Sequence, residues 1–299
     1  METLATIHEL RAWRRRRPKK VALVPTMGAL HEGHLAHLDL ALRHADDVVV
    51  SVFVNPTQFG PSEDFDRYPR DLERDMRACA ARGATAVFCP SVEEMYPSAL
   101  PEASVDVPPI SRELEGTHRP GHFPGVCRVV AKLLMMAMPD AATFGRKDFQ
   151  QLRVVQAMIA DLRMDVEVLE APTVRESDGL AMSSRNRYLS EEGRQRARGI
   201  SQSLQACREL LADKKQATVA ELETLLRERM AAHKLDIDYA VVRDAAWLEA
   251  VPEVSADGPP AVAVSTCRVE GTRLLDNLLL NRPDPSYRVG DGKAATPTP

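Results

Sequence analysis

The chain has 299 residues, of which 44% are hydrophobic and 5% aromatic, so it is long enough to bury a sizeable core in one large or two medium domains. Its formal net charge of −4 argues against a nucleic-acid partner, whose electrostatic footprint would be basic. No apolar stretch approaches the ~18 residues of a membrane span, and no apolar segment follows the basic residues near the N-terminus, so we expect no membrane span and no signal peptide.

The cysteines and one basic run carry further information. Five cysteines are scattered along the chain without a C-x-x-C pair, which argues against a disulfide framework or a zinc site and favours a reducing cytoplasm. The run from Arg14 to Lys20 follows a predicted first helix, where cations suit the negative helix end. We interpret this run as a solvated helix terminus in preference to a nucleic-acid patch.

Strands and helices alternate through the first part of the chain. Short apolar runs predict strands at Val21–Pro25, Val48–Val54, Ala84–Phe88, Ala141–Phe144 and Val166–Leu169, and helices are expected from about Glu32, Pro69, Val126 and Phe149. The nearly all-apolar run at Val48 is typical of a parallel strand covered on both faces. The alternation predicts an α/β, Rossmann-like parallel sheet with helices on both sides, whose ligands bind beyond the carboxyl ends of the strands.

The pattern changes after about residue 173. Two helices, near 191–212 and 219–234, precede strand-like runs at 238–242, 261–265 and 272–276. Helices followed by strands predict a smaller α+β domain. We therefore expect a domain over 1–173, a C-terminal lid domain over 174–283, and a disordered tail over 284–299, which is rich in Pro, Gly and Asp.

The first chemically informative segment joins the first long strand to the next helix. It reads Pro25-Thr26-Met27-Gly28-Ala29-Leu30-His31-Glu32-Gly33-His34. A helix N-terminus offers free N–H groups and a positive dipole end, and two histidines near one face of its first turn add donors, so the segment suits a phosphate. The alternative is a pair of exposed polar residues, which is the commoner meaning of an isolated H-x-x-H.

Three further segments are chemically informative, and the first two of them directly follow predicted strands. Asn55-Pro56-Thr57-Gln58 offers neutral amides to an acid, although Asn-Pro is also a turn dipeptide. In the stretch Gly145-Arg146-Lys147-Asp148, followed by Gln151, the lysine could contact phosphates and the aspartate could cap a helix. The stretch Met182-Ser183-Ser184-Arg185 suits phosphate oxygens, and a solvated polar loop is its alternative.

These four segments, in this order, carry a resemblance to a known family. The first resembles the H-x-G-H signature of the nucleotidylyl transferase superfamily, and the fourth resembles the mobile phosphate loop of class I aminoacyl-tRNA synthetases. The full set is similar to the pantoate–β-alanine ligases. Further matches lie at Tyr68-Pro69-Arg70, Leu114-Glu115-Gly116, Arg119 to Phe123, and Leu274 to Asn277.

The resemblance implies an enzyme that forms an amide bond from pantoate and β-alanine, with ATP and Mg²⁺, through a pantoyl-adenylate. It implies a proton-donating role for His34, assisted by His31 and Lys147. The implied ATP-binding residues are Met27, Gly28, Ala29, Leu30, His31, Glu32, Gly33, His34, Gly145, Arg146, Lys147, Asp148, Val174, Met182, Ser183, Ser184 and Arg185. Gln58 and Gln151 match the pantoate-binding positions, and Asn55, Arg119 and His122 complete the acid pocket.

Two points depart from the family pattern or stay open. Arg146 occupies a position where the family commonly carries Glu, so its contact with ATP is expected through the backbone. The Mg²⁺ ligands are open between Asp71, Asp75 and the substrate phosphates with water. The family habit implies a homodimer in the cytoplasm that binds small molecules, without a nucleic-acid or membrane partner.

Other functions remain as alternatives at this point. A phosphopantetheine or nicotinamide mononucleotide adenylyltransferase would leave the Asn55 and Arg119 segments unused. A tRNA synthetase fragment would need a basic or long helical domain for tRNA. A non-catalytic nucleotide sensor would tolerate loss of His31, His34 or Lys147, and all three are present.

Overall fold

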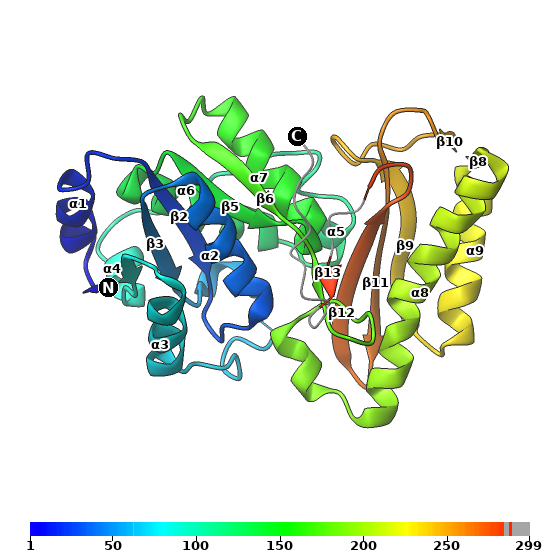
Figure 1. The fold of residues 1–299 in the computed structure, drawn as a ribbon, viewed down its shortest axis with the longest axis horizontal. Helices are drawn as coiled ribbons and strands as arrows, with labels where there is room; N and C mark the ends of the chain where they lie inside the picture. The colour runs from blue at the N-terminus through cyan, green and yellow to red at the C-terminus, as the bar shows by residue number, and fades with distance from the viewer. Residues whose placement is uncertain (62, 284–286, 289–299) are drawn as a thin grey trace. The chain divides into compact units, whose positions relative to one another are not determined.

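The computed structural model describes residues 1–61, 63–283 and 287–288 and divides the chain into two compact units (Figure 1). Unit 1 comprises Met1–Gly145 and Gln150–Ala171, and unit 2 comprises Arg146–Phe149 and Pro172–Pro299. The turn at Arg146 groups with unit 2 because the Asn277 amide donates hydrogen bonds to the carbonyls of Arg146 and Lys147. The tail predicted over 284–299 lies outside the described residues, apart from Tyr287 and Arg288.

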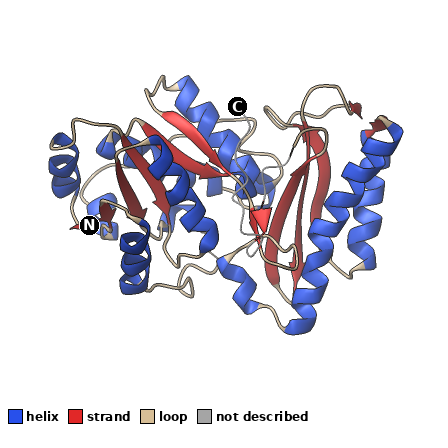
Figure 2. Ribbon diagram, viewed as in Figure 1, coloured by secondary structure: helices blue, strands red, loops and turns tan. Residues whose placement is uncertain are grey.

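Unit 1 is built on a six-stranded parallel sheet with the order β1-β4-β3-β2-β5-β6, and helices lie on both of its sides (Figure 2). This confirms the predicted Rossmann-like sheet. The strands are β1 (Glu2–Leu4), β2 (Val21–Thr26), β3 (Asp47–Val52), β4 (Ala86–Phe88), β5 (Ala141–Gly145) and β6 (Glu167–Ala171). The helices are α1 (Ile7–Arg15), α2 (Glu32–His44), α3 (Leu72–Arg82), α4 (Val92–Met95), α5 (Glu115–His118), α6 (His122–Ala137) and α7 (Phe149–Asp161), with the 3₁₀ helix η1 at Pro56–Gln58.

The buried residues of β2 and β3 explain why these strands are apolar throughout. Ala22 and Val24 belong to the same core cluster as Val48 and Val50, together with Leu38 of α2. The intervening residues Val21, Leu23 and Val49 are buried as well, so each strand is covered on both faces. In this strand order the chain turns in opposite directions from β2 and from β5, which are neighbours, so the switch point of the sheet lies between them.

Unit 2 combines two long helices with a three-stranded antiparallel sheet of order β12-β11-β9 (Figure 1). Its elements are η2 (Arg146–Asp148), β7 (Val174–Arg175), η3 (Ser184–Tyr188), α8 (Glu191–Lys214), β8 (Gln216–Thr218), α9 (Val219–Ala232), β9 (Asp236–Asp244), β10 (Glu253–Ser255), β11 (Ala261–Val269), β12 (Thr272–Leu279) and β13 (Tyr287–Arg288). Ile200, Leu204 and Leu211 lie on one face of α8 and pack in one core with Leu226 of α9 and Ala263 of β11. This is the predicted smaller α+β unit.

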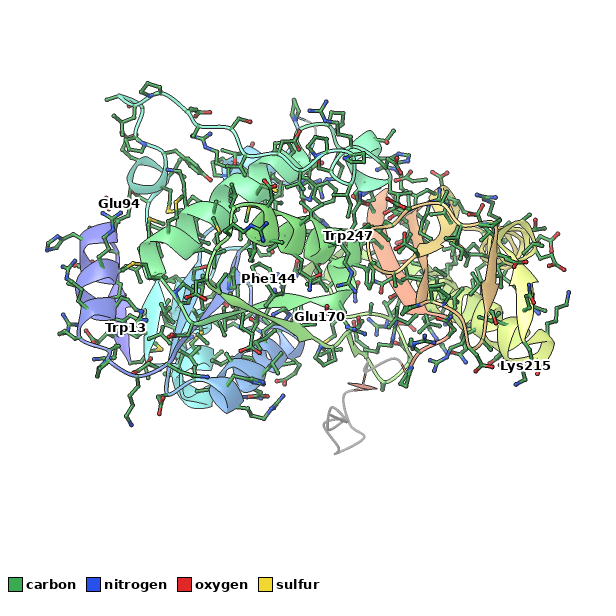
Figure 3. All side chains as sticks on the ribbon, turned by 90° about the horizontal axis from the view of Figure 1, so that it is seen from above. Trp13, Glu94, Phe144, Glu170, Lys215 and Trp247 are labelled. Atoms are coloured by element: carbon green, nitrogen blue, oxygen red, sulfur yellow. The ribbon has the colours of Figure 1, made fainter. Side chains whose placement is uncertain are left out.

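The basic run near the N-terminus ties α1 to its surroundings. Arg14 donates to the carbonyl of Met138, and Arg17 pairs with Asp47 at 3.0 Å. The Arg17 guanidinium also lies 5.2 Å from the ring centre of Trp13 (labelled in Figure 3), and the Trp13 side chain is fully buried. Part of the run is therefore engaged in ion pairs and hydrogen bonds within unit 1.

The helices and the cysteines bear on two expectations from the sequence, the absence of a membrane span and of disulfides. Within the described residues, no helix is both long and apolar enough to cross a membrane. All five cysteines are free thiols, at positions 79, 89, 127, 207 and 267.

Candidate active site

A buried carboxylate of α3 accepts hydrogen bonds from the turn between β2 and α2. Gly28 and Ala29 both have positive φ, of 80° and 51°, which lets the chain turn sharply after the strand. Asp75, which is 1% exposed, accepts the backbone N–H groups of Ala29 and Leu30, both at 2.8 Å. A Cβ on Gly28 would lie 2.9 Å from Asp75 Oδ2, so only glycine fits this approach. Burial raises the pKa of Asp75, against the two amide hydrogen bonds, which lower it.

The two histidines of the motif cap α2 reciprocally. His31 is the N-cap residue, and its Nδ1 accepts from the backbone N–H of Gly33 at 3.1 Å. His34 Nδ1 in turn accepts from the backbone N–H of His31 at 3.4 Å, and the ring centres are 4.1 Å apart. Both Nδ1 atoms are therefore acceptors, which places the ring proton of a neutral histidine on Nε2. The pair presents two Nε2–H donors at a helix N-terminus, a setting that suits an anion.

Asn55, the N-cap residue of η1, is buried and makes several side-chain hydrogen bonds. It is 1% exposed, and its Nδ2 donates to Gln58 Oε1 at 2.9 Å and to the carbonyl of Gly125 at 3.2 Å. Its Oδ1 accepts from the hydroxyl of Tyr96 at 2.8 Å and from Thr57. Gln58 Nε2 lies 3.2 Å from the sulfur of Met27, so η1 and the turn after β2 are adjacent.

Arg119 and His122 fix the backbone of η1 and the segment that follows it. Arg119 pairs with both oxygens of Glu63, through Nε at 2.7 Å and Nη2 at 2.6 Å. Its Nη1 lies 3.0 Å from His122 Nε2, while His122 Nδ1 lies 2.8 Å from the carbonyl oxygen of Gln58. Although burial acts to raise it, hydrogen bonds and charge from Arg119 hold the pKa of Glu63 below its usual range.

The partners of His122 determine its protonation state. A guanidinium only donates and a carbonyl only accepts, so Nε2 carries the lone pair and Nδ1 carries the hydrogen. Burial, followed by the charge of Arg119, lowers the pKa of His122 to about 4, which agrees with a neutral ring. His122 is therefore a neutral bridge between Arg119 and Gln58.

Close packing of α6 against η1 depends on Gly125. A Cβ at this position would lie 2.1 Å from the carbonyl oxygen of Thr57. At the start of α7, Gln150 is buried and binds the carbonyls of Ile110 and Glu113 and the N–H of Glu115. The neighbouring Gln151 is half-buried, and its side chain makes no hydrogen bond within the described part of the chain, so the side chains of the two adjacent glutamines differ in role.

In unit 2, Asn277 of β12 holds the turn that contains the predicted ATP lysine. Its Nδ2 donates to the carbonyls of Arg146 at 2.9 Å and Lys147 at 2.8 Å. Lys147 Nζ lies 3.4 Å from Asp148 Oδ1. These contacts fix the backbone on both sides of the lysine, whose side chain is 22% exposed.

The loop from Val174 to Arg185 is braced by buried polar groups. Arg175 forms an ion pair with Asp276, at 2.6 and 3.1 Å, and Met182 N–H donates to the carbonyl of Val174. Ser183 caps η3 by accepting from the N–H of Arg185 at 3.2 Å. Ser184, the first residue of η3, lies between them. The predicted phosphate loop is thus a structured turn within unit 2.

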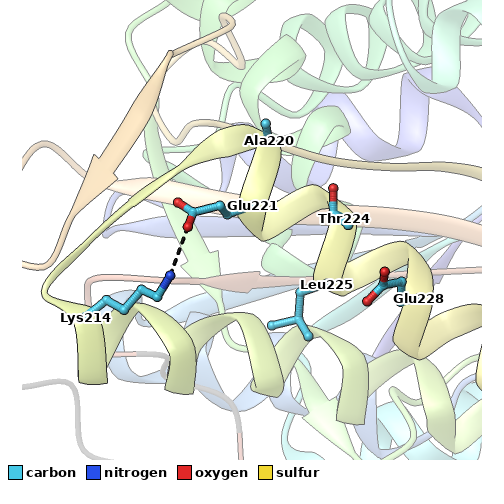
Figure 4. A pocket seen from close by; sticks show the side chains of 6 residues that line it. All are labelled: Lys214, Ala220, Glu221, Thr224, Leu225 and Glu228. Carbon is cyan, nitrogen blue, oxygen red and sulfur yellow. Dashed lines mark hydrogen bonds and ion pairs between the residues drawn. The ribbon is translucent and has the colours of Figure 1, made fainter.

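A separate surface hollow lies between α8 and α9 (Figure 4). It is shallow, with a volume of about 420 Å³, and is lined by Lys214, Ala220, Glu221, Thr224, Leu225 and Glu228. Lys214 and Glu221 pair across it at 2.9 Å. It contains none of the residues expected to bind ATP or an acid.

Several residues that support the site were not identified from the sequence. Tyr96 and Glu63 act through contacts with segments that are distant in the sequence, and no motif marks them. Asp75 was considered only for a metal, whereas both of its oxygens accept backbone amides. Asp71 caps α3 by accepting the N–H of Arg74. Among the described residues, no group of three or more His, Cys, Asp or Glu side chains is arranged to hold a metal ion.

The fold and the β2–α2 turn define the class of protein. A parallel sheet whose central strand leads through a glycine turn to a helix start with paired histidines is the arrangement expected of a nucleotidylyl transferase.

Comparison with known proteins identifies the family. The family described as Pantoate-beta-alanine ligase matches residues 2–279, and the chain belongs to this family. A pantothenate synthetase of Nocardioides sp. is 49% identical over 93% of this chain and 83% of its own length, and one of Acidothermus cellulolyticus is 46% identical over 93% and 91%.

Solved structures of pantothenate synthetases are similar to this chain over most of its length. The pantothenate synthetase of Thermus thermophilus has a TM-score of 0.88 and 44% identity, covering 95% of this chain and 100% of its own. The pantoate-β-alanine ligase of Francisella tularensis, crystallised with β-γ ATP and β-alanine, has a TM-score of 0.77 and 28% identity, covering 95% and 99%.

Proposed function

We propose that this chain joins pantoate to β-alanine in an ATP-dependent reaction that forms pantothenate and releases AMP and pyrophosphate. The geometric observation that carries the proposal is the contact between Gln58 Nε2 and Met27 Sδ at 3.2 Å. It brings the side chain expected to bind the acid next to the turn expected to bind ATP. A carboxylate can attack a phosphate only if the two ligands are held side by side.

The first half-reaction joins two anions. A carboxylate oxygen of pantoate attacks the α-phosphorus of ATP, and the bond from that phosphorus to pyrophosphate breaks. The site must supply donors at the phosphates and neutral hydrogen bonds at the acid. We assign the donor role to His34 and His31, whose Nε2–H groups lie at the start of α2. We assign Gln58 and Gln151 to hydrogen bonds with pantoate.

The second half-reaction consumes the adenylate. The amine nitrogen of β-alanine attacks the acyl carbon, the carbon–oxygen bond to AMP breaks, and the nitrogen loses a proton as the amide forms. The oxygen that pantoate contributed leaves with AMP. An adenylate is prone to hydrolysis, so the site is expected to exclude water.

We assign the remaining ATP contacts to the segments that match the family's pattern. The turn from Met27 to His34 provides the first of them, followed by Gly145 at the end of β5. Lys147 contacts phosphates as a point charge and Arg146 contributes its backbone, which Asn277 fixes. The remaining proposed contacts are Asp148, Val174, Met182, Ser183, Ser184 and Arg185.

Magnesium fits this site as part of the substrate MgATP. Both oxygens of Asp75 accept backbone amides and Asp71 caps a helix, so neither is set out as a dedicated ligand. Mg²⁺ commonly keeps several waters and binds substrate phosphates in place of a protein cage. We further propose that the protein is a homodimer in the cytoplasm, to which its free thiols are suited.

The proposal is tested by incubating the purified protein with ATP, pantoate and β-alanine and measuring AMP. AMP and pantothenate should form in equal amounts, and omitting either pantoate or β-alanine should abolish turnover. Labelled pyrophosphate should exchange into ATP when pantoate is present and β-alanine is absent. Turnover with a nucleotide or phosphopantetheine in place of pantoate, and none with pantoate, would contradict the proposal.

The role of His34 has a matched control on its own helix. His34→Ala should lower kcat by about 10²–10³-fold, the usual effect of losing one preorganised donor. His44 lies at the other end of α2, where its Nδ1 is 2.9 Å from the carbonyl of Leu40. His44→Ala should leave kcat unchanged. Equal rates for the two variants would remove His34 from the mechanism.

A further inference from the structure

The hydrogen bonds beneath η1 fix which end of the Gln58 amide faces a ligand. The backbone N–H of Thr57 can only donate, and it points at Asn55 Oδ1 at 3.3 Å. The oxygen of Asn55 is therefore on this side of its amide, and the nitrogen is on the other. That nitrogen faces two acceptors, Gln58 Oε1 and the carbonyl of Gly125. A flipped Asn55 amide would set donor against donor at Thr57 and acceptor against acceptor at Gly125.

The orientation passes from Asn55 to Gln58. Because Asn55 donates to Gln58 Oε1, the oxygen of the glutamine is turned inward. Its Nε2 is turned to the side of Met27, at 3.2 Å from the sulfur. Gln58 therefore offers N–H donors, and an acceptor such as a carboxylate or hydroxyl oxygen is the matching ligand group.

Tyr96 completes the arrangement from the loop after α4. Its hydroxyl donates to Asn55 Oδ1 at 2.8 Å, the shortest of the three contacts to that oxygen. Burial raises the pKa of Tyr96, so the phenol stays protonated and remains a donor. The Arg128 guanidinium lies 4.7 Å and the Lys132 ammonium 5.1 Å from the ring centre, and cations near the ring strengthen the hydroxyl as a donor.

We propose that Tyr96, acting through Asn55, is a positioning residue that holds Gln58 as a hydrogen-bond donor toward the acid substrate. The inference rests on the proposed function of Gln58. It assigns Asn55 a supporting role, because Asn55 is 1% exposed and its amide oxygen and nitrogen are both engaged. Arg119 and His122 support the same residue from its backbone carbonyl.

A double-mutant cycle on the whole enzyme tests this inference. The variants are Tyr96→Phe, Gln58→Ala and the double variant, and the measured quantities are kcat/KM for pantoate and KM for ATP. Tyr96→Phe should lower kcat/KM for pantoate about 3- to 10-fold, the effect of one hydrogen bond, and change KM for ATP less than about twofold. In the Gln58→Ala background the same substitution should have almost no further effect, because its route to the substrate is gone.

A control separates positioning from a loss of stability. Thr85 lies before β4, at the amino edge of the sheet, and its hydroxyl binds the carbonyl of Val48 at 2.9 Å. Thr85→Val removes this hydroxyl, which also accepts the backbone N–H of Val48 at 2.9 Å, and should leave pantoate kinetics unchanged. Gln58→Glu should bind pantoate no better than Gln58→Ala, because it replaces the outward nitrogen with a second oxygen.

The outcomes distinguish the inference from the function on which it rests. If Gln58→Ala changes pantoate kinetics but the effect of Tyr96→Phe is absent, or adds fully to it, the positioning role is wrong and the acid site stands. If Gln58→Ala leaves pantoate kinetics unchanged, the acid site itself is misplaced and the inference fails with it.

Discussion

The neutral state of buried His122 predicts how unit 1 responds to acid. Folding lowers the pKa of this imidazole from 6.5 to about 4, since burial and the charge of Arg119 disfavour the imidazolium. An imidazole that resists protonation stabilises the fold fully above the unfolded pKa. That stability is lost as the pH falls from 6.5 toward 4.

The size of the effect follows from these two values. They differ by about 2.5 pH units at about 1.4 kcal/mol each, so the full loss is about 3.5 kcal/mol, most of it already reached near pH 4.5. His122→Asn removes the titrating ring, while its amide can still donate to the carbonyl of Gln58. The variant should therefore lose about 2–2.5 kcal/mol less than the parent between about pH 7 and about pH 4.5.

The assay is urea unfolding followed by the fluorescence of Trp13. The chain has two tryptophans, Trp13 buried in unit 1 and Trp247 half-exposed in unit 2 (Figure 3), so a Trp247→Phe background reports unit 1 alone. Acid should also weaken the Glu63–Arg119 pair, because the pKa of Glu63 is lowered in the fold, but it does so in both proteins. Parallel stability curves for parent and His122→Asn would refute the reasoning.

Three further substitutions test the supports of the site. Asp75→Asn should lower the free energy of unfolding by about 2–4 kcal/mol, because one of the two backbone N–H donors then faces an NH₂ group. Asp71→Asn should leave it nearly unchanged, because Asn is an equally good N-cap residue. Urea unfolding measures both. Gly125→Ala should cost about 1–3 kcal/mol and raise KM for pantoate, since its Cβ would lie 2.1 Å from a carbonyl oxygen; an unchanged KM would contradict this. Asn277→Ala should raise KM for ATP, whereas Asn281→Ala, which frees carbonyls remote from Lys147, should lower stability only.

The elements that the sequence predicts well are those whose burial is uniform. Val48 to Val52 forms most of β3 because both of its faces are covered, and a nearly all-apolar run expresses that directly. The edge strand β1 and the short helices α4 and α5 were not expected. Each has three or four residues, too few to show a period.

The motifs identify which residues belong to the site, but they do not predict the hydrogen bonds that these residues form. The histidine pair was considered either a phosphate site or two exposed polar residues, and the structure shows that the two rings also cap α2. The expected contacts of Asn55, Arg119 and His122 with the acid stay a prediction. In the structure Asn55 binds Gln58, Arg119 binds Glu63, and His122 lies between Arg119 and the Gln58 carbonyl. Sequence identifies which residue types are present, but donor and acceptor assignments depend on contacts between segments far apart in the chain.

The central claim is that an oxygen of pantoate attacks the α-phosphorus of ATP at this site. The most direct measurement uses pantoate labelled with oxygen-18 in its carboxylate, together with ATP and β-alanine, and determines the mass of the AMP released. If the reaction proceeds through pantoyl-adenylate, each AMP carries one oxygen-18 atom and the pantothenate amide has lost one. AMP without the label, formed while pantothenate accumulates, would contradict the account.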